Sequence, residues 1–192
     1  MRLTLSLALL ATLAACDKKA DEAPQANAAN AANAAAVDEP EVELAGKLDM
    51  THRGEAAPAA AFQDAQGKPV HISDFRGTPV LVNLWATWCG PCVRELPSLD
   101  RLAGTAKGKL VILPASQDDP GNADPKAYWA EKKFTALPLY TDPKMVLGAA
   151  YATGVLPTSV LYDAKGKEVW RIVGGLEWDG PRANTLLAPV IG

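Results

Sequence analysis

The sequence predicts an α/β fold with a central mixed β-sheet and helices on both of its faces. Two nearly continuous apolar runs, 79–85 and 110–115, have the length and composition of strands buried on both sides. Between them, from about residue 91, apolar side chains recur at helical spacing. This strand–helix–strand order, followed by a later pair of strands and a last helix, favours a mixed sheet covered on both faces.

The remaining elements follow from turn and capping signals. Asp124-Pro125 and Asp142-Pro143 each resemble an N-cap followed by proline, and predict helices near 125–134 and 143–152. An N-terminal β-hairpin extension is predicted around Gln66-Gly67. The other predicted elements are hairpin strands at 60–64 and 69–72, a short helical turn at 73–75, paired strands at 158–162 and 167–173, and a last helix at 179–190.

Length and charge limit the classes of function. The chain has 192 residues, 48% of them hydrophobic, and a formal net charge of −3. This is room for one globular domain and some additional sequence. The mild negative charge, without a basic cluster, argues against a nucleic-acid partner.

The N-terminus has the pattern of an export signal. A positive start and a short apolar run over 1–15 are typical of a secretory signal peptide, because a membrane span needs about 20 apolar residues. Cys16 closes this run as in the lipobox of bacterial lipoproteins, which implies lipidation at Cys16; the alternative is ordinary cleavage with an incidental cysteine. Asp17 resembles a signal for retention at the inner membrane. We therefore expect a signal peptide at 1–15, a lipidated N-terminus with a flexible linker at 16–54, and one domain at 55–192.

Cys89-Gly90-Pro91-Cys92 lies between a predicted buried strand and a predicted helix, which suits thiol chemistry. A thiol attacks a disulfide as its thiolate, and a helix N-terminus stabilises that anion. Cys89 is expected to be the exposed attacking thiol, and Cys92, one turn inside, the more buried resolving thiol. Pro91 fits the first helical position.

Two other uses of the cysteines are weaker. Half of a zinc site would need two more ligands, but the chain has no second cysteine pair, and its histidines, His52 and His71, lie far away in the sequence. No metal site is therefore predicted. A peroxidatic cysteine in peroxiredoxins resembles T-x-x-C, whereas Thr87 is only two positions before Cys89.

The segment 82–97, with its Trp-Cys-Gly-Pro-Cys core, resembles the thioredoxin superfamily, and more narrowly the TlpA/ResA group of membrane-anchored reductases. The resemblance covers about residues 55–192. Asn83 stands where cytoplasmic thioredoxins carry a buried aspartate, Glu95 matches an acidic residue of the group, and the stretch 174–178 is similar to TlpA-like proteins. The stretch 154–159 resembles the family's cis-proline loop.

The resemblance implies a thioredoxin fold, a redox-active disulfide between Cys89 and Cys92, and no other cofactor. It also implies that Glu95 relays protons to the buried thiol, although a solvated helix carboxylate is the alternative. The residues expected to bind substrate are Trp88, Gly90, Pro91, Leu156 and Pro157. Trp85 is expected in the core, and Trp178 is assigned to packing rather than binding.

The function that this resemblance implies is reduction of disulfides in client proteins at the periplasmic face of the inner membrane. Apocytochrome c or the copper-site cysteines of respiratory oxidases are the expected clients, a membrane thiol transporter of the DsbD/CcdA type is the expected electron donor, and the protein is expected to be a monomer. One alternative is a disulfide oxidase or isomerase. Another is a metallochaperone that holds Cu(I) between the two thiolates.

Overall fold

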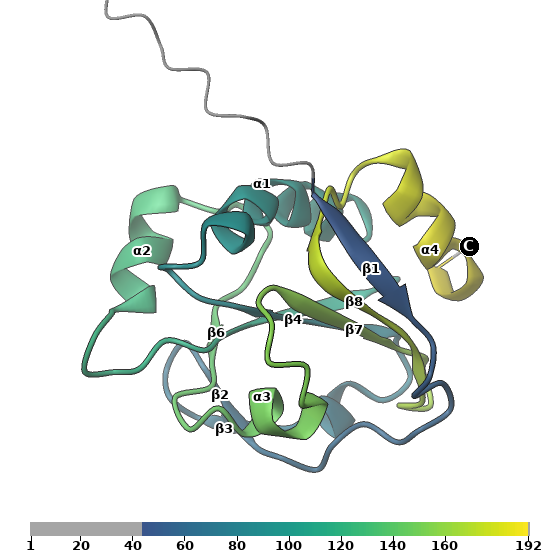
Figure 1. The fold of residues 1–192 in the computed structure, drawn as a ribbon, viewed down its shortest axis with the longest axis horizontal. Coiled ribbons are helices and arrows are strands. Elements are labelled where there is room, and N and C mark those ends of the chain that lie inside the picture. The colour runs from purple at the N-terminus through teal and green to yellow at the C-terminus, as the bar shows by residue number, and fades with distance from the viewer. Residues whose placement is uncertain (1–43, 192) are drawn as a thin grey trace, which may run out of the picture. The chain divides into compact units, whose positions relative to one another are not determined.

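The computed structural model describes residues 44–191, which form one mixed sheet with helices packed on both faces (Figure 1). Its strand order is β1-β8-β7-β4-β5-β6-β2-β3. The strands are β1 Ala45–Asp49, β2 Phe62–Asp64, β3 Pro69–Val70, β4 Val80–Trp85, β5 Val111–Ser116, β6 Tyr140–Thr141, β7 Thr158–Tyr162 and β8 Glu168–Leu176. The helices are the short 3-10 helix η1 Ile72–Phe75 and α1 Gly90–Thr105, α2 Pro125–Lys132, α3 Val146–Tyr151 and α4 Pro181–Ile191.

Strand β4 is the centre of the sheet and carries the chain into the functional site. It pairs in parallel with β5 and antiparallel with β7, and all six of its residues are buried. Burial on both faces explains why its sequence is almost continuously apolar. The predicted strand–helix–strand order and the predicted mixed sheet are confirmed.

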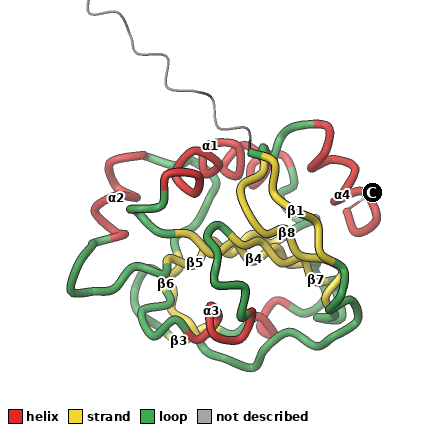
Figure 2. Tube along the Cα trace, in the orientation of Figure 1, coloured by secondary structure: helices red, strands yellow, loops and turns green. Residues whose placement is uncertain are grey.

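Alternate residues of β4 supply two separate apolar cores. Leu81 and Trp85 belong to the cluster that includes side chains of α1 and α4, whereas Val82 and Leu84 belong to the cluster that includes side chains of α3. Figure 2 shows α1 and α4 on one side of the sheet and α3 on the other. The helices on both faces therefore each bury an apolar stripe against the sheet.

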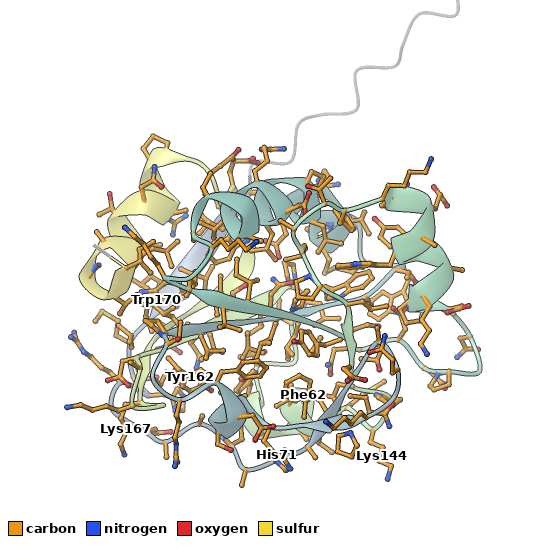
Figure 3. All side chains as sticks on the ribbon, turned by 180° about the vertical axis from the view of Figure 1, so that it is seen from behind. Phe62, His71, Lys144, Tyr162, Lys167 and Trp170 are labelled. Atoms are coloured by element: carbon orange, nitrogen blue, oxygen red, sulfur yellow. A yellow bond between two sulfur atoms is a disulfide. The ribbon has the colours of Figure 1, made fainter. Side chains whose placement is uncertain are left out.

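Aromatic side chains mark both cores (Figure 3). Phe62 and Tyr162 lie in the cluster that includes α3. Trp170 lies in the other cluster and donates its indole N–H to the carbonyl oxygen of Leu186 in α4, at 3.0 Å. The last helix is thus held to the sheet by a directed hydrogen bond as well as by apolar contact.

The folded domain begins earlier than predicted. The linker was expected to extend to residue 54, but Ala45–Asp49 forms the edge strand β1 and pairs antiparallel with β8. Gly46 is the buried residue of this strand, and a Cβ there would lie 2.6 Å from the carbonyl oxygen of Gly174. Since the pairing depends on a glycine and not on an apolar pattern, the sequence offers little sign of it. The predicted signal peptide and the predicted lipidation of Cys16 lie outside the described residues.

Helix α3 also departs from its prediction, because it begins at Val146 rather than at 143. The chain first turns over 142–145, with Met145 at a positive φ of 50°. Asp142 still caps the helix, since its carboxylate accepts the N–H groups of Val146 at 3.0 Å and of Leu147 at 2.8 Å. Asp124, by contrast, directly precedes α2 as predicted and accepts the N–H of Lys126 at 2.9 Å.

The hairpin β2–β3, the helical turn η1 and the strand pair β7–β8 occur where they were predicted, with small shifts at their ends. Strand β8 continues three residues beyond its predicted end, to Leu176. The short strand β6 was not predicted. It bridges β5 and β2 and thereby joins the N-terminal hairpin to the main sheet.

Candidate active site

The motif Cys89-Gly90-Pro91-Cys92 joins the end of β4 to the start of α1. Cys89 is the N-cap of α1, and its sulfur accepts the backbone N–H of Cys92 at 3.3 Å. The helix begins at Gly90, so Pro91 is its second residue rather than its first. A proline is tolerated there because the N–H groups of the first turn have no partner within the helix.

Cys89 and Cys92 are joined by a disulfide, with their Cα atoms 5.2 Å apart. Cys89 is 5% exposed and Cys92 is fully buried, so the predicted order of accessibility holds. The expectation of an exposed Cys89, however, is wrong for this disulfide form. Both side chains belong to the apolar cluster of α1, which covers most of the first sulfur as well as the second.

One exposed apolar side chain directly precedes the cysteine motif, and another directly precedes Leu156 of the cis-proline loop. Trp88, directly before Cys89, is 69% exposed, and Val155, directly before Leu156, is also exposed. Trp85, by contrast, is fully buried as expected, and its ring packs against Tyr128 and Trp129 of α2. The two tryptophans therefore separate into a core residue and a surface residue.

The predicted cis peptide bond between Leu156 and Pro157 is confirmed. The loop before it is closed by Thr158, whose hydroxyl donates to the carbonyl oxygen of Val155 at 2.7 Å. Leu156 packs against both apolar clusters, including the one that holds the two cysteines. Leu156 thus joins the cis-proline loop to the apolar cluster that includes Cys89 and Cys92.

Glu95 lies on α1, three residues after Cys92, and is fully buried. The alternative of a solvated helix carboxylate is therefore wrong. Its Oε1 accepts the side-chain amide of Asn83 at 2.7 Å, and its Oε2 accepts the backbone N–H of Leu176 at 2.9 Å and the indole N–H of Trp178 at 3.3 Å. Asn83 also donates to the hydroxyl of Ser159 at 2.9 Å, so its side-chain amide links α1, β4 and β7.

Burial raises the pKa of Glu95 from 4.5 to about 7, and the hydrogen bonds from Leu176, Asn83 and Trp178 limit the rise. A carboxyl group with this pKa exchanges a proton near neutral pH, as a proton relay requires. Trp178 packs in the core as assigned, but it also serves as a hydrogen-bond donor, which its sequence context did not reveal.

The Redoxin family matches residues 52–187, a range that contains the cysteines, Glu95 and the cis-proline loop.

The chain belongs to the Redoxin family.

Its curated relatives agree with this assignment. It is 33% identical to the thiol-disulfide oxidoreductase ResA of Bacillus cereus over 121 residues, which are 63% of this chain and 69% of the relative. It is 36% identical to the ResA protein of Geobacillus kaustophilus over 123 residues, which are 64% of this chain and 69% of the relative. This Redoxin-family chain is thus a ResA-like, thioredoxin-like thiol-disulfide oxidoreductase.

Solved structures show the same fold for this Redoxin-family domain. A Chlorobium tepidum protein described as the thiol:disulfide interchange protein DsbE matches 73% of this chain and 98% of its own, with a TM-score of 0.63 and 26% identity. The exposed lipoprotein thioredoxin Etrx1 of Streptococcus pneumoniae matches 67% of this chain and 98% of its own, with a TM-score of 0.58 and 30% identity. The predicted thioredoxin fold is confirmed.

A second carboxylate beside the redox motif of this Redoxin-family site was not found from the sequence. Asp118, just after β5, is buried, and both of its oxygens lie 3.1 Å from the backbone N–H of Thr87. It also accepts the hydroxyls of Thr87 at 2.8 Å and of Ser116 at 2.7 Å. The start of the loop 116–124, at Ser116, Gln117 and Asp118, is therefore buried.

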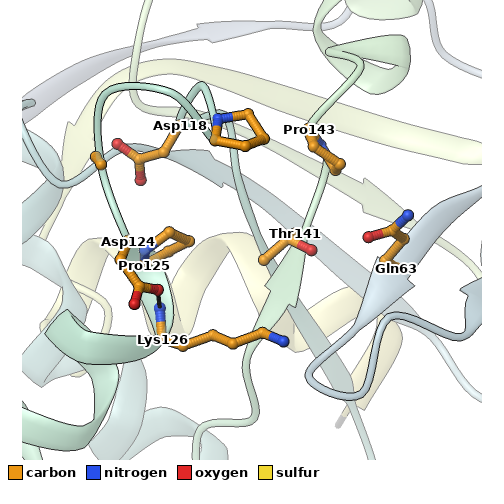
Figure 4. Close-up of a pocket in the computed structure, with 9 residues that line it drawn as sticks. Gln63, Asp118, Asp124, Pro125, Lys126, Thr141 and Pro143 are labelled. Atoms are coloured by element: carbon orange, nitrogen blue, oxygen red, sulfur yellow. Dashed lines mark hydrogen bonds between the residues drawn. The ribbon is translucent and has the colours of Figure 1, made fainter.

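Asp118 also lines a cavity of about 440 Å³ (Figure 4), and neither cysteine of the disulfide is among the residues that line it. Pro120, Pro125 and Thr141 line it as well. The carboxylate therefore stands between this hollow and the loop that leads to Cys89. The sequence contains one indication of this carboxylate, because Asp118 comes just after the apolar run that predicts strand β5. That strand pairs in parallel with β4, so the residues after both strands lie at the same edge of the sheet.

Within residues 44–191, no group of three or more potential metal ligands is gathered closely enough to hold an ion. In the same part of the chain, no helix combines the length and apolar composition needed to cross a membrane.

Proposed function

We propose that this enzyme reduces disulfides of client proteins at the periplasmic face of the inner membrane. The observation that carries the direction of exchange is the setting of the Cys89 sulfur. It accepts the N–H of Cys92 at the start of α1, and the buried carboxyl of Glu95 follows one turn later. A strongly oxidising thiol pair has a greatly stabilised thiolate in its reduced form. Here the helix N-terminus stabilises the Cys89 thiolate, whereas the Glu95 carboxylate nearby disfavours a thiolate. These opposing effects support a reduction potential near that of thioredoxin, about −270 mV.

In the proposed reaction, the Cys89 thiolate attacks one sulfur of a client disulfide. A mixed disulfide forms, and the other client sulfur leaves as a thiolate. Cys92 then loses its proton and attacks the Cys89 sulfur, which closes the bond seen here and releases the second client thiolate. Two electrons pass to the client. Of the two protons that its sulfurs take up, one is the proton that Cys92 loses, and the other comes from the solvent, into which Cys89 released its own on forming the thiolate.

Glu95 is proposed to accept the proton that Cys92 loses in the second step. Cys92 is fully buried, so its proton needs an acceptor inside the protein. A carboxyl group with a pKa of about 7 is ionised in enough molecules to accept it and protonated in enough molecules to return it.

Clients are proposed to bind as an extended segment along the cis-proline loop. The peptide group before Pro157, at Leu156, offers backbone hydrogen bonds of the kind that add a strand. The exposed side chain of Trp88 adds apolar contact area beside Cys89, and Gly90 leaves room for the client backbone because it carries no side chain.

The proposed location follows from the export pattern at 1–15 and from Cys16, which we propose is lipidated. The name of the pneumococcal neighbour, an exposed lipoprotein thioredoxin, supports the same arrangement. At that membrane face, the clients would be apocytochrome c or copper-site cysteines of an oxidase, and a DsbD/CcdA-type thiol transporter would return the electrons.

The decisive experiment traps clients in cells that produce Cys92→Ala. This variant forms the mixed disulfide and cannot resolve it, so proteins bound through Cys89 accumulate. Cys89→Ala is the matched control and should trap none. The clients are identified from the trapped complexes. In a separate measurement, equilibration of the wild-type protein with dithiothreitol gives its reduction potential.

A potential close to −120 mV, as for a strong oxidant, would contradict the proposed direction and favour a disulfide oxidase. Recovery of activity from scrambled ribonuclease would favour an isomerase. Tight, stoichiometric Cu(I) binding without disulfide turnover would favour a metallochaperone.

A further inference from the structure

Asp118 holds a turn whose last residue is Cys89. The backbone N–H of Cys89 donates to the carbonyl oxygen of Ala86 at 3.1 Å, so Thr87 and Trp88 occupy the middle of a tight turn. Asp118 bonds both the backbone and the hydroxyl of Thr87. The path of the chain into the N-cap of α1 therefore depends on a side chain 29 positions after Cys89.

The register of the sheet explains why Asp118 reaches this turn. Trp85 pairs with Ser116 in the parallel β4–β5 ladder, and the N–H of Gln117 donates to the carbonyl oxygen of Trp85 at 2.8 Å. Two residues beyond each strand, Asp118 lies opposite Thr87. The Gln117 side chain instead reaches Asp142, at 3.1 Å, so the two residues that follow β5 contact different parts of the fold.

A carboxylate is a costly choice for a place that is only 3% exposed. It offers what a neutral side chain of this size does not: two oxygens that accept the N–H of Thr87 and the hydroxyls of Thr87 and Ser116 together. These charge-assisted bonds are stronger than neutral ones and hold their partners in one geometry.

We propose that Asp118 is a positioning residue for disulfide exchange. Acting through Thr87, it sets the Ala86–Cys89 turn, and with it the alignment of the Cys89 sulfur on the N–H of Cys92. This inference rests on the proposed exchange chemistry at Cys89. Misplacing a reacting group by about 1 Å can cost about 100-fold in rate, so a loosened turn has a measurable effect.

The test uses the full chain and four variants. Asp118→Asn keeps the shape but replaces one acceptor oxygen with a donor. Thr87→Val removes the hydroxyl without changing any charge, and Thr87→Ser restores it. Asp100→Asn is the matched control, because Asp100 also accepts backbone N–H groups from a loop, at 135–137, but lies more than two turns from the motif.

Two quantities are measured for each variant: the rate of insulin disulfide reduction, and the pH midpoint of Cys89 alkylation by iodoacetamide in a Cys92→Ala background. We expect Asp118→Asn to slow reduction about tenfold, well within the range that misplacement produces. Thr87→Val should slow insulin reduction less than Asp118→Asn does. It should also raise the pH midpoint of Cys89 alkylation, because the Cys89 thiolate loses its alignment with the N–H of Cys92 while the charge of Asp118 is unchanged. Thr87→Ser and Asp100→Asn should match the wild type in both measurements.

Wild-type rates from folded Asp118→Asn and Thr87→Val would overturn the inference while leaving the proposed function intact. A rate loss of equal size in Asp100→Asn would also overturn it, since any loosened loop would then suffice. If Asp118→Asn does not fold, Thr87→Val against Thr87→Ser decides alone. A wild-type protein that reduces no disulfide would overturn the proposed function and this inference together.

Discussion

Two buried glutamates of this protein carry out different tasks on opposite faces of the sheet. Glu168, at the start of β8, is paired with Arg171 through two bonds of 2.7 Å. Glu95, on α1, is equally buried but accepts its hydrogen bonds from an amide, a backbone N–H and an indole. The first carboxylate is neutralised by a cation, whereas the second has neutral donors and a pKa raised by burial to about 7. A carboxylate buried with a counter-ion thus forms a structural ion pair, whereas a carboxyl group buried without one has a raised pKa and can transfer a proton.

Arg171 joins Glu168 to the rest of the fold, because it also donates to the carbonyl oxygen of Tyr151 at the end of α3, at 3.0 Å.

The largest expected effect is on stability, from Arg171→Met. This change leaves the Glu168 carboxylate buried without its partner, which typically costs about 3–5 kcal/mol. Urea unfolding at pH 7 measures the loss. Disulfide exchange per folded molecule should stay close to wild type, because the pair lies outside the redox motif. The double variant Glu168→Gln, Arg171→Met should recover part of the stability, and failure to do so would contradict the counter-ion account.

The next effect is the pH dependence that Glu95 creates. Its folded pKa of about 7 lies above its usual 4.5, so the folded state binds a proton that the unfolded state releases in this range. Stability from this group is complete below about pH 4.5 and falls as the pH rises to about 7, by about 3 kcal/mol. Glu95→Gln should remove this decline, as measured by urea unfolding of the oxidised protein at pH 5 and pH 8.

The same variant tests the role of Glu95 in exchange. We expect Glu95→Gln to slow the step in which Cys92 resolves the mixed disulfide by about 100-fold, the lower end of what a positioned acid–base group contributes. The pH dependence of that step near 7 should disappear with it. An unchanged profile in Glu95→Gln would remove Glu95 from the reaction and leave it a structural carboxyl.

The smallest effect comes from Asn83→Asp. This nearly isosteric change replaces the amide that donates to Glu95, at 2.7 Å, with a second carboxyl group. Like charges at this distance raise the pKa of one partner, and a rise of one unit corresponds to about 1.4 kcal/mol. The stability decline should therefore continue to a higher pH than in the wild type. Asn83→Ser serves as the control that removes the amide without adding charge.

The sequence predicted a helix or strand well wherever the residues that indicate it lie within that helix or strand or directly beside it. The apolar run of β4, the helical stripe after Cys89 and the N-cap at Asp124 each predicted their element to within a few residues. Edge strands were harder. Strand β1 is held by close approach of Gly46 to β8, and β6 by pairing with β5 and β2, so neither leaves a local pattern.

The candidate site divides in the same way. Its cysteines and its helix N-terminus lie within one short segment, and the resemblance of the stretch 154–159 to the family's cis-proline loop indicated the cis bond before Pro157. The partners of Glu95 come from β4 and from the end of β8, and the clamp on Thr87 comes from the end of β5. These contacts join residues 12 to 83 positions apart, which no local pattern encodes.

By itself, the sequence determined the α/β order of the elements, the presence of the Cys89-Cys92 pair and its place at the start of a helix, because propensity and capping act over a few neighbouring residues. Only the tertiary structure decided that Glu95 is buried without a counter-ion, that Cys89 is largely covered in its disulfide form, and that Asp118 reaches Thr87. Burial and sheet register depend on which distant segments pack together, and the proton affinity of a carboxyl group depends in turn on that burial.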